Sequence, residues 1–164
     1  MKNIILIGFM GSGKTTVGKI LAKNLNFNFI DTDELIEKNE SMTIPKIFEI
    51  YGENYFRKCE NKILNNLKNV NKCVISTGGG FPVYLKKINI LKSLGIIFYL
   101  HANCETLLKR VKSSNRPLLK NFFNLYRTRL PYYKKISDFK IDTDYINPDK
   151  ISLIIQEIYE NCGR

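Results

Sequence analysis

A glycine-rich segment near the amino terminus carries the strongest chemical signal in the chain. Residues 8–15 read GFMGSGKT and match the pattern G-x-x-x-x-G-K-[ST] at every position. Glycines let successive backbone N–H groups point at phosphate oxygens, and a helix that begins beside the loop adds the positive end of its dipole. Lys14 can reach the β- and γ-phosphates of a nucleotide, and the Thr15 hydroxyl can ligate Mg²⁺. The alternative is a plain glycine-rich turn, but the apolar run before the segment and the helical spacing after it favour nucleotide binding.

Two carboxylates follow the next apolar run. Asp31 and Asp33 are separated by one residue, so both side chains lie on the same face of an extended segment. One carboxylate could hold Mg²⁺ through water, and the other could accept a hydrogen bond from a hydroxyl group and orient it for phosphorylation. Alternatively, one of the two aspartates caps a helix that begins near Asp33.

Arg57 and Glu60 are three residues apart in a segment with helical spacing, so both side chains lie on one face. Glu60 could fix the guanidinium of Arg57, whose planar fork would then bind an anionic substrate through two hydrogen bonds. The spacing alone favours the simpler interpretation, a surface ion pair worth less than about 1 kcal/mol.

Two further segments could carry chemistry. The glycines 78–80 follow a third apolar run and either make a tight turn or let a substrate approach the backbone closely. Arg116 lies in a stretch without periodicity. An arginine on a mobile loop can close over phosphates and neutralise charge in the transition state, whereas the alternative is a solvated side chain.

The hydrophobic pattern predicts the elements that position these residues. Strands are expected at 3–8, 28–31, 72–77, 95–101 and 139–142. Helices are expected after the glycine-rich segment and at 33–38, 44–67 with a break near Gly52, 82–94, 105–111 and 124–136. A last helix begins at Pro148 and is capped by Asn147. Residues 113–123 are expected to form a loop.

This alternation predicts an α/β fold, a five-stranded parallel sheet with helices on both faces. Ligands of such sheets bind beyond the carboxyl ends of the strands, where three of the segments described above fall. A length of 164 residues fits one domain, residues 1–164, and is too short for two ordinary ones.

Composition excludes several other classes of protein. Apolar residues make up 44% of the chain and charged residues 25%, which is typical of globular proteins and not of disordered ones. No apolar run reaches the roughly 18 residues that a membrane span needs, and the first run leads into a glycine loop instead of a cleavage site. A cytoplasmic protein is expected. The four cysteines are scattered and His101 is the only histidine, so neither a zinc site nor a disulfide framework is expected.

The net charge of +11 comes from 26 basic and 15 acidic residues. A positive field attracts anions, either small phosphorylated ligands or nucleic acid. However, 20 of the basic residues are lysines. They are dispersed along the chain and not interleaved with aromatic residues, which favours a general lysine bias over a nucleic-acid site. We expect neither a nucleic acid nor a membrane as a partner.

Together these segments resemble the shikimate kinase family, from near the amino terminus to about Pro148. The marks, in this order, are GFMGSGKTT at 8–16, DTD at 31–33, FRKCE at 56–60, STGGG at 76–80, RPLL at 116–119 and RLPYY at 129–133. The phosphate-binding segment is shared widely among nucleotide-binding proteins, whereas the combination of the others in this order is specific.

The resemblance implies a kinase that uses ATP and Mg²⁺ to phosphorylate the 3-hydroxyl of shikimate, on the route to chorismate and the aromatic amino acids. It implies a P-loop kinase fold of the nucleoside monophosphate kinase type, with a substrate-binding region at 33–61 and a lid at 112–123.

The resemblance also implies a role for each matching residue. The catalytic residues would be Lys14, Asp33 and Arg116. Thr15 would ligate Mg²⁺, with Asp31 one water molecule farther out. ATP would be bound by Gly11, Ser12, Gly13, Lys14, Thr15, Thr16 and Arg116. Shikimate would be bound by Asp33, Gly79, Gly80 and two arginines that hold its carboxylate, Arg57 and Arg129.

Two features depart from the family pattern. The stretch at 116–129 is short compared with that of many members, which affects the lid. Ile146 stands where some members have an arginine near the adenine, so contacts with the base there must be apolar or made by the backbone. Arg110 could lie against the adenine instead.

The main alternative function is that of another small P-loop kinase, one for gluconate or a nucleotide. Such an enzyme would share the phosphate-binding segment and the sheet, but it would not need both Arg57 and Arg129 or the triple glycine. The pattern shows no apolar stripe that forces association, so a monomer is expected.

Overall fold

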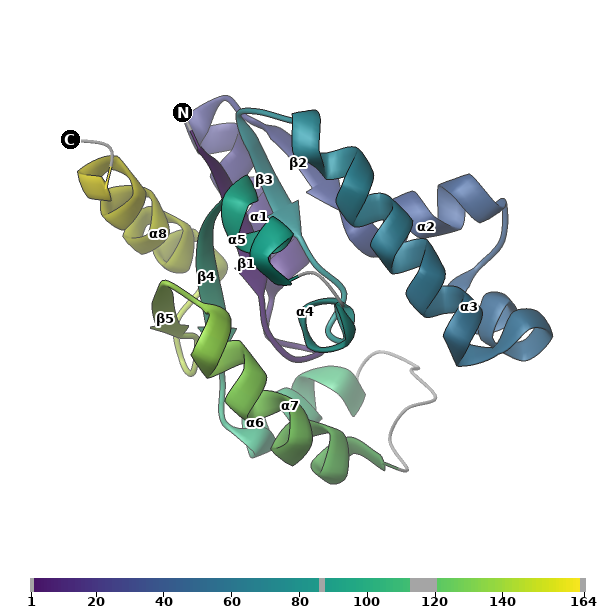
Figure 1. Ribbon diagram of the computed structural model, residues 1–164. Coiled ribbons are helices and arrows are strands. Elements are labelled where there is room, and N and C mark those ends of the chain that lie inside the picture. The colour runs from purple at the N-terminus through teal and green to yellow at the C-terminus, as the bar shows by residue number, and fades with distance from the viewer. Residues whose placement is uncertain (1, 86–87, 113–120, 163–164) are drawn as a thin grey trace.

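Five short strands form a parallel β-sheet in the order β2-β3-β1-β4-β5 at the centre of the molecule (Figure 1). The computed structural model describes residues 2–85, 88–112 and 121–162. The strands are β1 (Asn3–Ile7), β2 (Asn28–Asp31), β3 (Cys73–Ser76), β4 (Gly95–His101) and β5 (Phe139–Asp142). All pairings between neighbouring strands are parallel, so their carboxyl ends meet at one edge of the sheet.

Helices connect the strands and cover both faces of the sheet (Figure 1). They are α1 (Lys14–Leu25), α2 (Thr32–Glu40), α3 (Ile44–Asn66), α4 (Phe81–Tyr84), α5 (Ile88–Leu94), α6 (Cys104–Lys112), α7 (Phe122–Ile136) and α8 (Pro148–Cys162), with a 3₁₀ turn, η1, at Leu67–Asn69. The long helix α3 lies to one side together with α2, whereas α6 and α7 lie at the end of the sheet to which the strands β1 and β4 point (Figure 1).

The alternation of side chains along β1 divides the core into two layers. Ile4 and Leu6 pack on one face with residues of α1 and α8. Ile5 and Ile7 pack on the other face with residues of α3, α5 and α7. A strand buried on both faces needs an apolar side chain at each position, which explains the unbroken apolar run at the start of the chain.

Most predicted elements are confirmed. The strands at 28–31, 95–101 and 139–142 have the predicted bounds. Gly52 breaks α3 as predicted, with non-helical dihedral angles of φ 75° and ψ 176°. Asn147 caps α8, because its side-chain Oδ1 accepts a hydrogen bond of 2.8 Å from the backbone N–H of Lys150.

Two predicted elements differ from the structure. The helix expected over 82–94 is divided in two, because Leu85 has extended dihedral angles and ends α4 after Tyr84. The loop expected at 113–123 is shorter at its end, where Phe122 already begins α7. Residues 113–120, the centre of the expected lid, lie outside the described residues.

Two findings for the described ranges concern membrane-spanning helices and metal sites. None of their helices combines the length and the apolar character that a membrane-spanning segment needs. Within the same ranges, no group of three or more histidine, cysteine, aspartate and glutamate side chains is arranged to hold a metal ion.

Candidate active site

A cavity of about 480 Å³ opens at the carboxyl ends of β1, β2 and β3. Its walls come from the loop after β1, from the carboxylates after β2 and from the glycines after β3. At its far end it reaches α6 and the start of α8. The residues that line it are Met10–Val17, Asp31, Asp33, Ser76–Gly79, Arg110, Val111, Ile146, Pro148 and Ile151. Ligands of parallel sheets bind at this kind of place.

The segment Gly8–Thr15, called the phosphate loop from here on, curls around one end of the cavity. Gly11 and Gly13 have φ angles of 79° and 91°, which side chains other than glycine rarely adopt. Gly13 lies directly before α1, so the free N–H groups of the helix end face the loop. The Lys14 ammonium is buried and donates to the carbonyl oxygens of Gly8 and Phe9 at 2.9 and 3.0 Å. A fixed positive charge and a ring of N–H donors thus converge, as phosphate binding requires.

Three side-chain oxygens meet beside the phosphate loop. The Thr15 hydroxyl donates to Asp31 Oδ2 at 2.9 Å and lies 3.5 Å from Ser76 Oγ. Hydroxyl and carboxylate oxygens are the hard ligands that Mg²⁺ prefers, and Mg²⁺ usually keeps several waters. The donor set therefore fits this ion, with Thr15 next to the phosphate loop and Asp31 behind it.

Asp31 also caps a helix. Its second carboxylate oxygen, Oδ1, accepts a hydrogen bond of 3.0 Å from the backbone N–H of Asp33, and α2 begins at Thr32. The two aspartates predicted to share a face therefore differ: Asp31 caps the helix and accepts from Thr15, whereas Asp33 does not cap it. Both line the cavity.

The glycines Gly78–Gly80, called the glycine loop from here on, make room for charged side chains. A methyl group built on Gly78 would collide with the Asp33 carboxylate, and one on Gly80 would lie 2.8 Å from Arg57 Nη1. The expected turn is present, because the Phe81 N–H donates to the Gly78 carbonyl at 3.0 Å. None of the three glycines has a positive φ, so the turn alone does not require glycine. The Gly78 N–H donates to the Thr32 hydroxyl at 3.0 Å, which fixes the loop against the start of α2.

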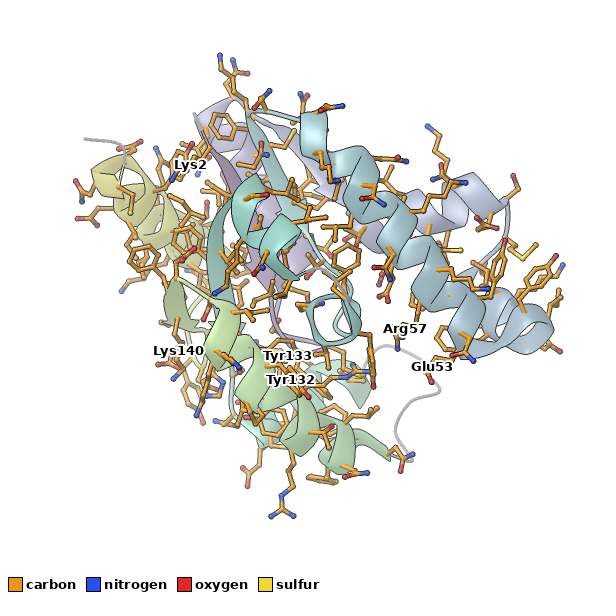
Figure 2. The ribbon with its side chains drawn as sticks, viewed as in Figure 1. Lys2, Glu53, Arg57, Tyr132, Tyr133 and Lys140 are labelled. Carbon is orange, nitrogen blue, oxygen red and sulfur yellow. The ribbon has the colours of Figure 1, made fainter. Side chains whose placement is uncertain are left out.

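Arg57 on α3 is held on three sides. Its Nη1 donates to Glu60 at 2.8 Å, and its Nη2 and Nε donate to one oxygen of Glu53 at 2.7 and 3.1 Å. Figure 2 shows Glu53 beside Arg57 on α3. The ring of Tyr84 covers the guanidinium, with its centre 3.9 Å from Cζ. The predicted pair with Glu60 is thus confirmed, and it is largely buried instead of exposed.

Glu60 is the most deeply buried carboxylate of this group, with 1% of the residue exposed. Burial raises the pKa of Glu60 to about 7, against the lowering effect of the Arg57 guanidinium; Asp33 raises it further and Arg129 lowers it. Its Oε1 accepts no hydrogen bond from the described residues. The charges of Asp33 on α2, Arg57 on α3 and Arg129 on α7 therefore all act on the Glu60 carboxyl.

Arg129 reaches the same place from α7. It is buried, and its guanidinium lies 5.9 Å from the ring centre of Phe9 and 5.8 Å from that of Tyr84. A methyl group on Gly79 would lie 3.5 Å from Arg129 Nη1. The structure thus brings Arg57 and Arg129, which are far apart in the chain, to adjacent residues of the glycine loop.

The other end of the cavity is mostly apolar. Ile146, Pro148 and Ile151 line it together with Arg110. The Arg110 guanidinium donates to the Thr143 carbonyl at 2.8 Å and approaches the Gly11 carbonyl at 3.4 Å. A flat apolar group would find contacts here, and Arg110 links this end to the phosphate loop.

Sequence reasoning missed several residues of the site. Glu53 is four residues before Arg57 on the same helix, a spacing that predicts an ion pair. Tyr133 belongs to the RLPYY segment, but the sequence assigned it no role, and Tyr84 gave no signal. Their contacts with the Gly79 carbonyl and with Arg57 depend on packing between distant elements. Arg116, which the family resemblance makes catalytic, lies outside the described residues.

Known proteins resemble this chain over most of its length. The family model for shikimate kinase matches residues 10–162. A shikimate kinase of Caldicellulosiruptor saccharolyticus is 46% identical over 156 residues, which cover 91% of this chain and 90% of that protein. The structure of a shikimate kinase from Acinetobacter baumannii in complex with shikimate is 38% identical, with a TM-score of 0.88, and the match covers 98% of this chain and 94% of that one.

More distant kinases share the architecture. A gluconokinase from Sinorhizobium meliloti is 17% identical with a TM-score of 0.57, over 98% of this chain and 95% of that one. At such low identity the likeness shows the fold alone. The predicted fold class, a P-loop kinase fold with a five-stranded parallel sheet, is confirmed.

Proposed function

This chain belongs to the shikimate kinase family, and on that premise we propose that it transfers the γ-phosphoryl group of ATP to the 3-hydroxyl of shikimate. The products are shikimate 3-phosphate and ADP, and the reaction is a step toward the aromatic amino acids. One observation carries the proposal: a complete phosphate loop lies next to a glycine loop that has two arginines beside it, Arg129 near Gly79 and Arg57 near Gly80.

The phosphate loop is the proposed ATP site. The backbone of Gly11, Ser12 and Gly13 and the side chains of Lys14, Thr15 and Thr16 would bind the phosphates, because all six line the same end of the cavity. The Lys14 charge would stabilise the negative charge that develops on the transferred group. Thr15 and Asp31 would hold Mg²⁺, which neutralises phosphate charge when bound.

The cluster around the glycine loop is the proposed shikimate site. Arg57 and Arg129 would hold the carboxylate, since planar guanidinium groups bind carboxylates through paired hydrogen bonds. Gly79 and Gly80 would lie against the ring. Asp33 would accept a hydrogen bond from the 3-hydroxyl and orient it toward the nucleotide.

The transfer forms one bond and breaks one. The 3-hydroxyl oxygen bonds to the γ-phosphorus, the bond from that phosphorus to the bridging oxygen breaks, and ADP leaves with the electron pair. Asp33 would accept the hydroxyl proton, because its carboxylate lines the cavity beside Gly78 whereas Asp31 is engaged by Thr15 and the start of α2. Positioning and charge supply most of the catalysis in phosphoryl transfer.

The remaining expectations concern the domain organisation, the oligomeric state, the location and the partners of the protein. We propose a single domain over residues 1–164, in which residues 33–61 bind shikimate. A monomer in the cytoplasm, without a nucleic-acid partner, remains an expectation from the sequence. Gel filtration at micromolar concentration would test the monomer directly.

A substrate panel tests the proposed reaction. The protein is mixed with ATP and Mg²⁺ and, in separate reactions, with shikimate, gluconate and a set of nucleosides and nucleoside monophosphates, and ADP release is measured. We expect release with shikimate well above that with each other acceptor. A kinase for gluconate or a nucleotide, the alternative with less support, would instead show its highest rate with one of those acceptors.

A further inference from the structure

Tyr133 on α7 carries a buried hydroxyl that meets two groups of the active site, the Gly79 carbonyl and the Arg129 guanidinium. The residue is 1% exposed, and its hydroxyl donates to the Gly79 carbonyl at 2.5 Å. Burial raises the pKa of Tyr133, so the hydroxyl keeps its proton and remains a donor at neutral pH. Figure 2 shows Tyr133 on the helix α7, on the side of α4 away from Arg57. A helix that carries Arg129 is therefore bonded directly to the glycine loop.

Gly79 lies where the two proposed binding sites meet. A methyl group built on it would lie 3.5 Å from Arg129 Nη1, 3.6 Å from the Met10 backbone nitrogen and 3.7 Å from the Gly8 carbonyl oxygen. The peptide at Gly79 thus borders the phosphate loop on one side and the arginine on the other. A rotation of this peptide would alter the surface that both ligands meet.

The bond from Tyr133 determines which way this peptide points. In a trans peptide the carbonyl of one residue and the N–H of the next point in opposite directions, and the structure contains no cis peptide among its described residues. When the hydroxyl holds the Gly79 carbonyl on the α7 side, the Gly80 N–H is turned away from α7. Within the described ranges, the Gly79 and Gly80 N–H groups donate to no protein acceptor. Of the two residues, Gly79 lines the cavity.

Apart from Tyr133, one side chain among the described residues bonds to the backbone of the glycine loop, and it does so at Gly78. Gly78 is fixed through its N–H by Thr32, and Phe81 begins α4 with a bond to the Gly78 carbonyl. Between these points the backbone consists of glycines, which have the largest conformational freedom of any residue. The Gly80 carbonyl accepts hydrogen bonds of 3.0 and 3.1 Å from the Val83 and Tyr84 N–H groups. The Tyr133 hydroxyl holds the remaining carbonyl of the glycine loop, that of Gly79.

We propose that Tyr133 is a positioning residue: its hydroxyl fixes the Gly79–Gly80 peptide so that the backbone N–H groups of the glycine loop face the acceptor substrate. The inference rests on the proposed function, since that substrate is taken to be shikimate. Tyr133 acts through the backbone and does not touch the reacting atoms.

Tyr133→Phe tests this with little disturbance to the core, because the ring stays in contact with the ring of Tyr99, 5.3 Å away between centres. Removal of one neutral hydrogen bond predicts a rise of about 3- to 10-fold in the KM for shikimate. The KM for ATP and kcat are expected to stay within about 2-fold. Tyr132→Phe is the matched control, because Tyr132 is 49% exposed and its change should leave all three constants as in the parent.

Residue-resolved hydrogen exchange supplies the second readout. In Tyr133→Phe the amides of Gly79 and Gly80 are expected to exchange at least about tenfold faster, while the amides of β1 keep the parent rate. A merely structural role would lower the unfolding temperature and raise exchange across the core without a selective change in the KM for shikimate. That result, or an equal rise in both KM values, would overturn the proposal. A higher KM for shikimate without faster exchange at Gly79 and Gly80 would also overturn it, since Tyr133 would then act through Arg129.

The kinetics of the parent protein in the same assay distinguish a failure of the proposed function from a failure of the role of Tyr133. If the parent does not phosphorylate shikimate, the proposed function fails. If the parent does so and Tyr133→Phe keeps its KM, only the role of Tyr133 fails.

Discussion

The phosphate end and the glycine-loop end of the cavity are built in different ways. The phosphate end consists of consecutive residues in one strand–loop–helix unit, and its Lys14 is held by carbonyls of the same loop. The glycine-loop end is assembled from α2, α3, α7 and the loop after β3, which supply Asp33, Arg57, Arg129 and the glycines. The first depends on local backbone geometry, and the second depends on the packing of elements that are far apart in the chain.

The two ends also differ in charge. The phosphate end combines N–H donors with one buried ammonium. The glycine-loop end places two arginines among the carboxylates of Asp33, Glu53 and Glu60, one of which is fully buried. Substitutions at the first end should therefore affect chemistry, whereas those at the second should affect substrate affinity and the pH dependence of stability.

Lys14→Met should have the largest effect. It removes the fixed charge beside the proposed γ-phosphate position, and we expect the rate of phosphoryl transfer to fall by about 10³-fold or more. If the two ends act separately, calorimetric titration should show shikimate affinity within about 2-fold of the parent. Lys23→Met, on the exposed surface of the same helix, is the control and should retain the parent rate. Activity within tenfold of the parent in Lys14→Met would refute the phosphate-loop assignment.

Asp33→Asn tests the one residue of the glycine-loop end that is proposed to take part in the chemistry, so its effect should be on kcat. The change keeps the volume but removes the charge that would orient the hydroxyl or accept its proton, so kcat should fall by roughly 10²- to 10³-fold. The affinity for an ATP analogue should change little. Glu34→Gln, an exposed neighbour on α2, provides the control for charge. Unchanged turnover together with lower thermal stability would mean that Asp33 has only a structural role.

The buried carboxylate predicts an unusual pH dependence of stability. Burial raises the pKa of Glu60 to about 7, whereas an unfolded glutamate titrates near 4.5. Between these values the folded protein binds more protons than the unfolded chain, so stability falls as pH rises through this window and is level above it. The total change is roughly 3 kcal/mol, an order-of-magnitude value.

Urea unfolding of the parent and of Glu60→Gln from pH 5 to pH 8 measures this effect. The unfolding free energy of the parent, relative to that of the variant, should fall over this range. Glu49→Gln changes an exposed carboxylate on the same helix and should show no such trend. A relative stability that rises with pH would mean that the ion pair with Arg57, and not burial, controls Glu60.

Glu53→Gln should have the smallest effect. The Glu53 side chain is 55% exposed, so its pair with Arg57 is worth well under about 1 kcal/mol. Glu60 and Tyr84 continue to hold the guanidinium. We expect the dissociation constant for shikimate to rise about 2-fold, and Glu49→Gln again serves as the control. A loss as large as that caused by changing Arg57 itself would show that both carboxylates are required.

The difference between the two ends also explains what the sequence could predict. A phosphate loop is readable because eight adjacent residues determine its backbone. Of the partners of Arg57, the sequence could predict only those on its own helix, Glu60 and Glu53, because they lie at helical spacing. The contacts of Tyr84 and Tyr133 depend on tertiary packing and have no local pattern. The triple glycine is visible in the sequence. The need for glycine there is not, because the Asp33 and Arg57 side chains occupy that space only in the folded structure.

The central claim is that the glycine-loop end binds a carboxylate through Arg57, independently of the phosphate end. The most direct test is a binding cycle: the parent and Arg57→Lys are each titrated with shikimate and with an analogue that lacks the carboxylate. Lysine keeps the charge but loses the planar fork, so Arg57→Lys should weaken shikimate binding by about 1–3 kcal/mol. The analogue should bind both proteins equally weakly, and the affinity for an ATP analogue should not change. If Arg57→Lys weakens binding of the analogue as much as that of shikimate, Arg57 does not recognise the carboxylate, and the account of this site is wrong.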